Sequence, residues 1–446
     1  MPLRFLLCLL YLTPCLTLPA AAKPPVKAIA PHSIPAVNAI DFLNSLGVCT
    51  HMAQGIDNPS QSAVCLKFAG IQNIRDDGSL THVPDWITVY QQSGARLCLL
   101  TNQNIPETLD MAKQLKAAGA LLAVEGPNEP NNAPVTFKGQ KSGYNTTALP
   151  IAQFQAALYK AVKAEPSLSG IPVFHSSEAG GSEKDNAGLQ FLTIPTGAGT
   201  LMPDGTQFAD FANTHNYVCG HKNAVIDNVG WNATDLTLNG DWDGMVGEYG
   251  HTWHGGFSGY SNEQLLRLPK VCTETGWTTR GSGSVTEEQQ ARILLNLFFD
   301  GYKQGWKYTF IYMLRDDPIQ GYWGLFDTNY APKTSGKYLH NLSTVLADKG
   351  TPVKPGRLNY SIVNQPATVH DLLLQKSNGT FEMAVWDEQV SGTSRVAVRF
   401  GAKQAAVKVY DPTLGTVPVQ ALKQVKSISL TLSDHPVILE IPRSGK

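Results

Sequence analysis

Two short segments of this chain place a glutamate at the end of an apolar, strand-like run. One is Gly-Pro-Asn-Glu-Pro, with its glutamate at position 129, and the other is Thr-Glu-Thr-Gly-Trp, with its glutamate at position 274. The two lie 145 positions apart (274 minus 129), so two different strands of one scaffold would have to present them. Two carboxyl groups that face each other across a sugar ring can break a glycosidic bond. Glu129 and Glu274 are therefore the first candidates for catalytic residues.

The neighbours of these glutamates favour a site over a solvated surface position, which is where a single glutamate usually lies. Pro127 and Pro130 stiffen the chain around Glu129 and cannot continue a strand ladder. Asn128 carries an amide donor and a carbonyl acceptor, and both suit a sugar hydroxyl. We expect Trp277 to form one wall of the site, because the glycine before it turns the chain.

The order of apolar runs and amphipathic stretches predicts the scaffold. Strand-like runs alternate with helical patterns such as residues 105–118, 151–164 and 286–304, which is typical of βα units and a parallel sheet. The eight expected strands span residues 46–52, 71–75, 96–101, 121–125, 171–176, 211–217, 270–274 and 308–313. We therefore expect an α/β fold, a (β/α)8 TIM barrel, whose chemistry sits at the carboxyl ends of the strands. An open doubly wound sheet is the alternative, although no phosphate-binding glycine loop follows an early strand.

Composition excludes several classes of protein. Of the 446 residues, 42% are hydrophobic, which is ample for a sizeable core, and 16% are charged, against an average of ~25%. The formal net charge of −1 gives no indication of a nucleic-acid surface. No Cys-x-x-Cys pair or zinc-ligand spacing occurs. We expect neither a metal nor an organic cofactor.

Five cysteines follow the first 22 residues, and their odd number leaves at least one thiol free unless chains are cross-linked. Cys49, Cys98 and Cys272 lie within apolar runs, as small core residues do. If a disulfide forms, the pairing Cys49–Cys65 is favoured.

Four segments follow one another along the chain. Residues 1–22 carry a basic residue, a short apolar run and small residues, which predicts a secretory signal peptide and a secreted or periplasmic protein. No later run approaches the ~18 apolar residues of a membrane span, so we expect no membrane association after signal removal. Residues 23–38 form a leader rich in Pro and Ala, and residues 39–348 form the barrel. Residues 349–446 consist of short β-rich runs with a hairpin signal at Asn378-Gly379, which predicts a C-terminal all-β sandwich.

The segment between the sixth and seventh expected strands is long and rich in aromatic residues. Long loops in a compact domain are usually functional or disordered, and aromatic side chains at their tips suit stacking on sugar rings. Packing within the loop is the equally open alternative. The residues concerned are Trp231, Trp242, Tyr249, His251, Trp253, His254 and Tyr260.

Taken together, these segments resemble the clan A glycoside hydrolases, a large group of retaining enzymes with (β/α)8 barrels. Asn-Glu-Pro after the fourth strand matches the clan's acid/base motif, and its longer form over residues 125–131 is most similar to the family thirty-nine and family five groups. Thr273-Glu274 at the end of the seventh strand matches the nucleophile position. The resemblance implies that Glu129 is the acid/base and Glu274 the nucleophile. Many relatives have a tryptophan before Asn-Glu-Pro, where this chain has Gly126-Pro127.

Arg75 matches an arginine that the clan often places after the second strand. Such an arginine would keep Glu274 ionised through a charge-assisted hydrogen bond. The alternative for Arg75 is a surface ion-pair network with Asp76 or Asp77.

Further positions of the clan's site are matched along the chain. His215 and Tyr217 resemble the His/Tyr pair of the sixth strand, where Tyr217 would orient the nucleophile and His215 is alternatively a core histidine. Tyr312 and Trp323 resemble the aromatic loop that floors the sugar subsite after the eighth strand. His51, after the first strand, is a candidate contact to a sugar hydroxyl.

The expected function is that of a secreted retaining glycosidase acting on β-linked, or stereochemically equivalent α-L-arabino, bonds of oligo- or polysaccharides. A carbohydrate-binding protein without turnover is the alternative, and a metal-dependent hydrolase is disfavoured because no His-x-His pair ends the first strand. Glu125, Glu178 and Glu248 are further acidic candidates. The sugar, the linkage, exo or endo action and the oligomeric state stay open.

Overall fold

The computed structural model describes residues 30–130, 132–143, 146–177, 184–218, 227–237, 252–253 and 257–443. The signal peptide predicted over residues 1–22 and the first part of the predicted leader, residues 23–29, lie outside these ranges. Within them, no helix combines the length and the apolar character needed to cross a bilayer.

Eight parallel strands form the first domain, in the spatial order β10-β13-β14-β3-β4-β5-β6-β9. A parallel bridge between Phe174 and Phe211 joins the two ends of this sheet and closes the barrel. In chain order the strands are β3 (Leu46–Cys49), β4 (Asn73–Asp77), β5 (Arg96–Leu100), β6 (Leu121–Glu125), β9 (Val173–Phe174), β10 (Ala212–His215), β13 (Lys270–Thr275) and β14 (Trp306–Ile311). The predicted TIM barrel is confirmed, because all eight expected runs contribute a strand and the connections are parallel.

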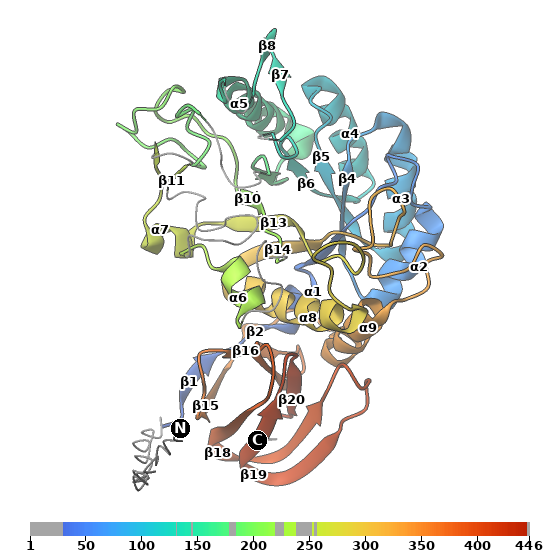
Figure 1. The fold of residues 1–446 in the computed structure, drawn as a ribbon, viewed down its shortest axis with the longest axis vertical. Coiled ribbons are helices and arrows are strands. Elements are labelled where there is room, and N and C mark those ends of the chain that lie inside the picture. Colours follow the sequence, from blue (N-terminus) through green and yellow to red (C-terminus); the bar gives the residue numbers. More distant parts are fainter. Residues whose placement is uncertain are drawn as a thin grey trace, which may run out of the picture.

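Helices surround this barrel (Figure 1). The longer ones are α2 (Pro59–Ala69), α3 (Val83–Ser93), α4 (Ile105–Ala117), α5 (Leu149–Ala164), α8 (Glu287–Lys303) and α9 (Thr334–Leu346). Local sequence explains several of their ends. The side chains of Asn58, Asn104 and Thr286 accept backbone N–H groups at the starts of α2, α4 and α8. Gly70 and Gly94 end α2 and α3 in the left-handed conformation that glycine adopts most easily.

The barrel is less regular between its fifth and seventh strands. The described residues between β9 and β10 contain no helix, and those between β10 and β13 hold only the short α6 (Val229–Thr234) and α7 (Asn262–Arg267), with the two-residue strands β11 (Thr252–Trp253) and β12 (Phe257–Ser258). A second small hairpin, β7 (Thr136–Phe137) and β8 (Gln140–Lys141), follows β6. Among the described residues, the connections between strands therefore depart from a regular barrel mainly in the aromatic-rich segment between β10 and β13.

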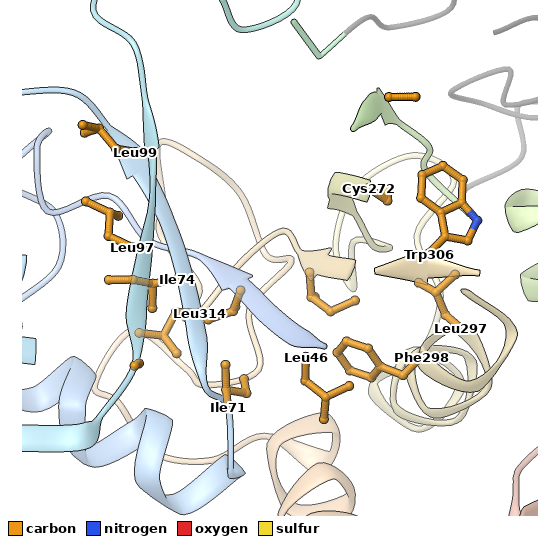
Figure 2. Close-up of a cluster of buried hydrophobic side chains, with 14 of the residues drawn as sticks. Leu46, Ile71, Ile74, Leu97, Leu99, Cys272, Leu297, Phe298, Trp306 and Leu314 are labelled. Atoms are coloured by element: carbon orange, nitrogen blue, oxygen red, sulfur yellow. The ribbon is translucent and has the colours of Figure 1, made fainter. Parts of the chain in front are cut away.

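Buried apolar side chains fix the barrel strands between an inner layer and the surrounding helices. Figure 2 shows part of the outer layer, in which Leu46, Ile74 and Leu97 project from neighbouring strands and Phe298 comes from α8. A separate inner cluster of Cys49, Cys98, Leu122, Ala123, Phe174, Val271, Phe310 and Met313 fills the barrel axis. Because both faces are covered, strands such as β5 and β6 read as nearly continuous apolar runs rather than alternating ones. This packing leaves only the carboxyl ends of the strands free to form a site.

The second domain is a mostly β unit, and the predicted all-β domain after the barrel is confirmed. Its sheet has the order β1-β15-β18-β20-β17-β16-β2, with β19 paired to β18. The strands are β1 (His32–Pro35), β2 (Val37–Asn38), β15 (Arg357–Val363), β16 (Val369–Gln375), β17 (Phe381–Asp387), β18 (Ser394–Tyr410), β19 (Gln420–Leu432) and β20 (Val437–Ile441). The hairpin at Asn378-Gly379 joins β16 to β17, with Gly379 at φ 88°. Not all of the β-rich runs expected here are short, because β18 is 17 residues long.

The described end of the leader belongs to this sheet, as β1 pairs with β15 and β2 with β16. The short helix α1 (Ala39–Leu43) follows at once and leads into the barrel. Both ends of the described chain therefore lie in the second domain (Figure 1). Pairing between segments more than 300 residues apart ties the leader to the C-terminal part of the chain.

The two domains share a buried aromatic interface. Trp386, on β17, is fully buried and stacks on Phe299 of α8 at 5.4 Å between ring centroids, as expected of a core residue. Trp231, on α6, stacks on His370 of β16 at 4.1 Å. The β domain is therefore packed directly against the barrel.

The predicted Cys49–Cys65 disulfide is wrong. Cys49, Cys65, Cys98 and Cys272 are buried free thiols. Cys49 belongs to the inner layer of the barrel, whereas Cys65 packs from α2 in the outer layer, so the strand wall separates them. The fifth cysteine, Cys219, lies outside the described residues.

Candidate active site

Glu129 and Glu274 meet at the carboxyl end of the barrel. Glu129 follows β6 and Glu274 is the fifth residue of β13. Oxygen atoms of both carboxylates and a ring nitrogen of His215 lie within 4.8 Å of one another. Two segments 145 positions apart (274 minus 129) are thus brought to one point by the strand order.

Arg75 connects the deeper part of the site to Glu274. Its Nη1 donates to Oε1 of Glu274 at 2.7 Å, and its Nε and Nη2 donate to the two oxygens of Glu125 at 2.8 and 2.9 Å. Nη2 also donates to Oδ1 of Asn128 at 2.7 Å. Burial opposes the charge of Arg75, but Glu125 and Glu274 raise its pKa well above the usual range. The surface network proposed as the alternative for Arg75 is not what the structure shows.

Glu125 lies one layer deeper and is completely buried. Besides Arg75, its oxygens accept from Thr273 Oγ1 at 3.0 Å, Asn213 Nδ2 at 3.2 Å and Cys98 Sγ at 3.4 Å. Burial raises the pKa of Glu125, but Arg75 outweighs it and the pKa is lowered. Glu125 is therefore an ionised anchor for the arginine and is closed off from the cavity.

Tyr217 supplies a second donor to Glu274, since its hydroxyl lies 2.7 Å from Oε2. Burial and the neighbouring carboxylate raise the pKa of this phenol, so it stays protonated and donates. Its ring meets Trp323 edge-on at 5.5 Å and Tyr312 at 6.4 Å. Glu274 is thus held by one donor on each oxygen beside an aromatic wall.

The backbone of Glu129 is in an uncommon conformation. Its φ is 37°, on the left-handed side that costs a non-glycine residue of order 1–2 kcal/mol. Its N–H donates to the carbonyl oxygen of Ser177 at 3.0 Å, which holds it in place. The glycine before this turn has a steric reason, because a Cβ at Gly126 would lie 1.9 Å from Oε1 of Gln155.

Two donors reach the carboxylate of Glu129. Nδ1 of His215 lies 2.8 Å from Oε1, and Nδ2 of Asn132 lies 3.2 Å from Oε2. Burial raises the pKa of Glu129, but the hydrogen bond and charge of His215 and the amide of Asn132 together lower it. Nδ1 of His215 is also 3.5 Å from Oε2 of Glu274, so the imidazole sits between the two carboxylates.

A cavity of about 420 Å³ opens over the pair. This volume falls within the ~300–1,000 Å³ usual for small-molecule sites. Most of the predicted site residues line it, namely His51, Arg75, Asn128, Glu129, Tyr217, Glu274, Tyr312 and Trp323. His51 packs edge-on against Tyr312 at 5.3 Å, and burial lowers its pKa.

Two predicted residues lie elsewhere. The prediction that Trp277 walls the site is wrong, because its side chain is 1% exposed within the core and its Nε1 donates to the carbonyl oxygen of Gly283. Gly276, with φ 150°, turns the chain so that this indole points away from the cavity. His215 does not line the cavity and reaches the carboxylates from behind.

The aromatic-rich segment contributes packing where it is described. Trp231 packs at the domain interface, and the hydroxyl of Tyr260 accepts the N–H of Leu192 at 2.9 Å. Trp253 falls in β11. The other named residues of this segment lie outside the described part of the chain, as do the acidic candidates at 178 and 248.

Several lining residues were not predicted from the sequence. Asp76 and Asp77 end β4, and Gln54 and Gln320 come from the segments after β3 and β14. Position alone would have identified the two aspartates, because polar residues at the carboxyl ends of barrel strands point to the site.

The ligand atoms of Glu129, His215 and Glu274 are close enough to hold a metal ion. The guanidinium of Arg75, however, already lies 2.7 Å from Glu274, and a second cation beside it would be repelled. The two carboxylates are instead matched by donors, Glu274 by Arg75 and Tyr217, and Glu129 by Asn132 and His215.

No family model matches the chain, and no curated protein matches it in sequence. In structure the chain is similar to a GH30 endoxylanase from Clostridium papyrosolvens C71, with TM-score 0.51, 11% identity and 90% of this chain and 96% of that chain covered. It is also similar to a glucosidase from Croceicoccus marinus, with TM-score 0.54, 10% identity and 94% of this chain and 100% of that chain covered. A third similar structure is SrfJ from Salmonella typhimurium, with TM-score 0.52, 11% identity and 95% of each chain covered. The fold that the resemblance to clan A implies, a barrel with a β domain, is thereby confirmed.

Proposed function

We propose that this protein is a retaining glycoside hydrolase that cleaves β-linked, or stereochemically equivalent α-L-arabino, bonds in oligo- or polysaccharides. The observation that carries the proposal is the pair Glu129 and Glu274, whose oxygens lie within 4.8 Å over a cavity. Carboxyl groups ~5–5.5 Å apart are typical of retention, whereas inversion needs ~6.5–9.5 Å to admit a water molecule. The close pair supports the retaining route.

Glu274 is the proposed nucleophile. One of its oxygens attacks the anomeric carbon and forms a glycosyl–enzyme ester, while the bond to the leaving oxygen breaks. Arg75 and Tyr217 hold the carboxylate, one on each oxygen, so it is aimed before substrate arrives. Asn128, itself fixed by Arg75, has its amide nitrogen left for a sugar hydroxyl.

Glu129 is the proposed acid/base. In the first step it gives its proton to the leaving oxygen, and in the second it takes one from the water that attacks the ester and frees Glu274. The donors from His215 and Asn132 lower its pKa, which suits the base of the second step. The acid of the first step is then populated at acidic pH, and we expect an acidic optimum.

The aromatic wall of Tyr217, Tyr312 and Trp323 supports a sugar as the substrate, since apolar ring faces of sugars stack on such side chains. From the N-terminal sequence we also propose that the protein is exported, to the medium or the periplasm. No observation favours a binding protein without turnover, and the tests below separate it from an enzyme.

The proposal is tested with a panel of aryl glycosides and a nuclear magnetic resonance time course on any that is cleaved. We expect the first product to keep the anomeric configuration of the substrate. Glu274→Ala should abolish turnover, whereas Glu129→Ala should keep part of its activity on substrates with good leaving groups and be rescued by azide. Glu263→Ala, an exposed residue of α7, is the control and should be unchanged. An inverted first product, or full activity of Glu274→Ala, would refute the mechanism, and loss of activity with a chelator would indicate a metal enzyme.

A further inference from the structure

The described lining of the cavity carries more negative than positive charge. The carboxylates of Asp77, Glu129 and Glu274 line it, against the single guanidinium of Arg75. Asp76 also lines it, but burial raises the pKa of this carboxyl to about 7, so it is not counted among these charges. Resting on the proposed function, we infer that the site accepts a neutral or cationic sugar ring and rejects a uronic acid, and that Asp77 is the residue that sets this specificity.

The charge of Arg75 is not free for an anionic ligand. Of its five N–H donors, four are directed to Glu125, Glu274 and Asn128 at 2.7–2.9 Å. Glu125 is buried behind the arginine and cancels its charge. Even with Glu129 protonated as the acid, Glu274 and Asp77 leave this part of the cavity negative.

Two further cations, in the segment that follows β14, are also paired with carboxylates. Arg315 donates to Oδ1 of Asp57 at 2.8 Å, and Lys333 lies 2.9 Å from Oδ2 of Asp316. Neither cation is among the described residues that line the cavity. A sugar carboxylate would therefore find no free counter-charge on the described walls.

Asp76 and Asp77 are adjacent but do different things. The oxygens of Asp76, which is 3% exposed, accept from Thr50 Oγ1 and from the N–H groups of Met52 and Asp77, each at 2.8 Å. Asp76 thus ties the segment after β3 to the end of β4, and its acceptor capacity is used within the protein. Asp77 is half-buried, and its one side-chain hydrogen-bond partner among the described residues is the amide of Gln54.

A chain of hydrogen bonds from the segments after β14 and β3 ends on Asp77, the last residue of β4. The hydroxyl of Tyr312 donates to Oε1 of Gln320 at 2.9 Å, Nε2 of Gln320 donates to Oε1 of Gln54 at 2.7 Å, and Nε2 of Gln54 donates to Oδ2 of Asp77 at 2.8 Å. Every donor points the same way, so Asp77 is the acceptor at the end. Oδ2 is held by Gln54, and no described residue donates to Oδ1, which is therefore the oxygen that we assign to a ligand.

A carboxylate in this position favours one class of ligand over another. It accepts strong charge-assisted hydrogen bonds from sugar hydroxyls, and it attracts an ammonium group. A carboxylate on the sugar ring would instead bring a like charge into a half-buried site, which is costly. Asp77 therefore selects against uronic acids while binding neutral rings.

The test compares substrates that differ only at carbon 6, the 4-nitrophenyl β-glucoside with the β-glucuronide and the β-galactoside with the β-galacturonide. The measured quantity is the ratio of kcat/KM for the neutral substrate to that for the acid. We expect a ratio of about 100 or more for the wild type, as one like-charge contact in such a site gives. Asp77→Asn keeps the size of the side chain and should lower the ratio about tenfold or more. Asp110→Asn, which removes one charge from the exposed surface of α4, is the matched control and should leave it unchanged.

A ratio below one, or a ratio that Asp77→Asn does not change, would overturn the inference. Raising the salt concentration should lower the wild-type ratio of kcat/KM values, because salt screens the repulsion between Asp77 and the carboxylate of the sugar. If no glycoside is hydrolysed, the proposed function fails, and calorimetric titration of 1-deoxynojirimycin, a cation when protonated, decides the inference by itself. At least tenfold weaker binding to Asp77→Asn than to the wild type supports it, and equal binding overturns it.

Discussion

Removal of the His215 imidazole beside Glu129 should move the basic limb of the pH–activity profile to higher pH. His215 Nδ1 lies 2.8 Å from Oε1 of Glu129, and this contact is the largest of those that lower the pKa of the carboxyl. Because Glu129 must be protonated in the first step, its pKa sets the pH above which activity falls. A lowered pKa places that limb on the acidic side.

The size of the change follows from the contacts. In His215→Leu the donor is lost while burial, which raises the pKa of Glu129, remains. An opposite charge or strong donor at this distance is worth about 1–3 pKa units, or ~1.4 kcal/mol for each unit. We therefore expect the basic limb to move up by at least about one unit. In His215→Asn the amide nitrogen lies close to the place of Nδ1 and keeps a neutral donor, so the limb should move less.

The assay is kcat/KM against pH, which reports the groups of the free enzyme. A substrate with a poor leaving group is required, because its cleavage depends on the acid. Only the basic limb is interpreted, because Nδ1 of His215 also lies 3.5 Å from Oε2 of Glu274 and the substitution changes the surroundings of both carboxylates. A basic limb that stays in place or moves down in a folded His215→Leu protein would refute the role given to Glu129.

Three further predictions concern residues around the site and the domain interface. Glu125→Gln leaves the buried Arg75 with one carboxylate partner fewer and should cost ~3–5 kcal/mol in urea unfolding, so a loss below ~1 kcal/mol would contradict its role as an anchor. Tyr217→Phe removes the 2.7 Å hydrogen bond to Glu274, worth ~1.5–3 kcal/mol, and should lower kcat about 10- to 100-fold with little change in KM; a rise in KM alone would be the wrong result. Burial lowers the pKa of His435, but Asp411 and Asp434 raise it to about 9, so its contribution is complete below pH 6.5 and is lost as pH rises through 9. The free energy of unfolding should then fall by up to ~3 kcal/mol between pH 6.5 and pH 9. Denaturation at these two pH values measures the fall, which His435→Gln should abolish.

The barrel could be predicted from the sequence because its signal is local. Strands that are covered on both faces are continuous apolar runs, and helices such as α4 and α8 begin at capping residues that the sequence displays. The carboxyl ends of the strands then locate Glu129 and Glu274 on one face without further information. The geometry of Arg75 and Tyr217 around Glu274 also agrees with what their positions suggested.

The features that were not predicted from the sequence depend on the direction in which side chains point and on pairing between distant segments. Trp277 follows a strand end, as a site residue would, but the backbone at Gly276 turns its side chain into the core. Cys49 and Cys65 are close in sequence, yet they face opposite sides of the strand wall. Pairing of the leader with β15 joins segments more than 300 residues apart, which no local pattern indicates.

The deepest residue of the network links the nucleophile to the choice of substrate. Without Glu125, Arg75 would hold Glu274 and leave a positive charge at the floor of the cavity. That charge would attract an anionic sugar. Because Glu125 takes two of the donors of this arginine, the guanidinium still orients the nucleophile but no longer offers charge to a ligand. The carboxylate of Asp77 at the rim is then unopposed on the described walls. A single buried ion pair in this way serves both the orientation of the proposed nucleophile and the rejection of uronic acids that we infer for Asp77.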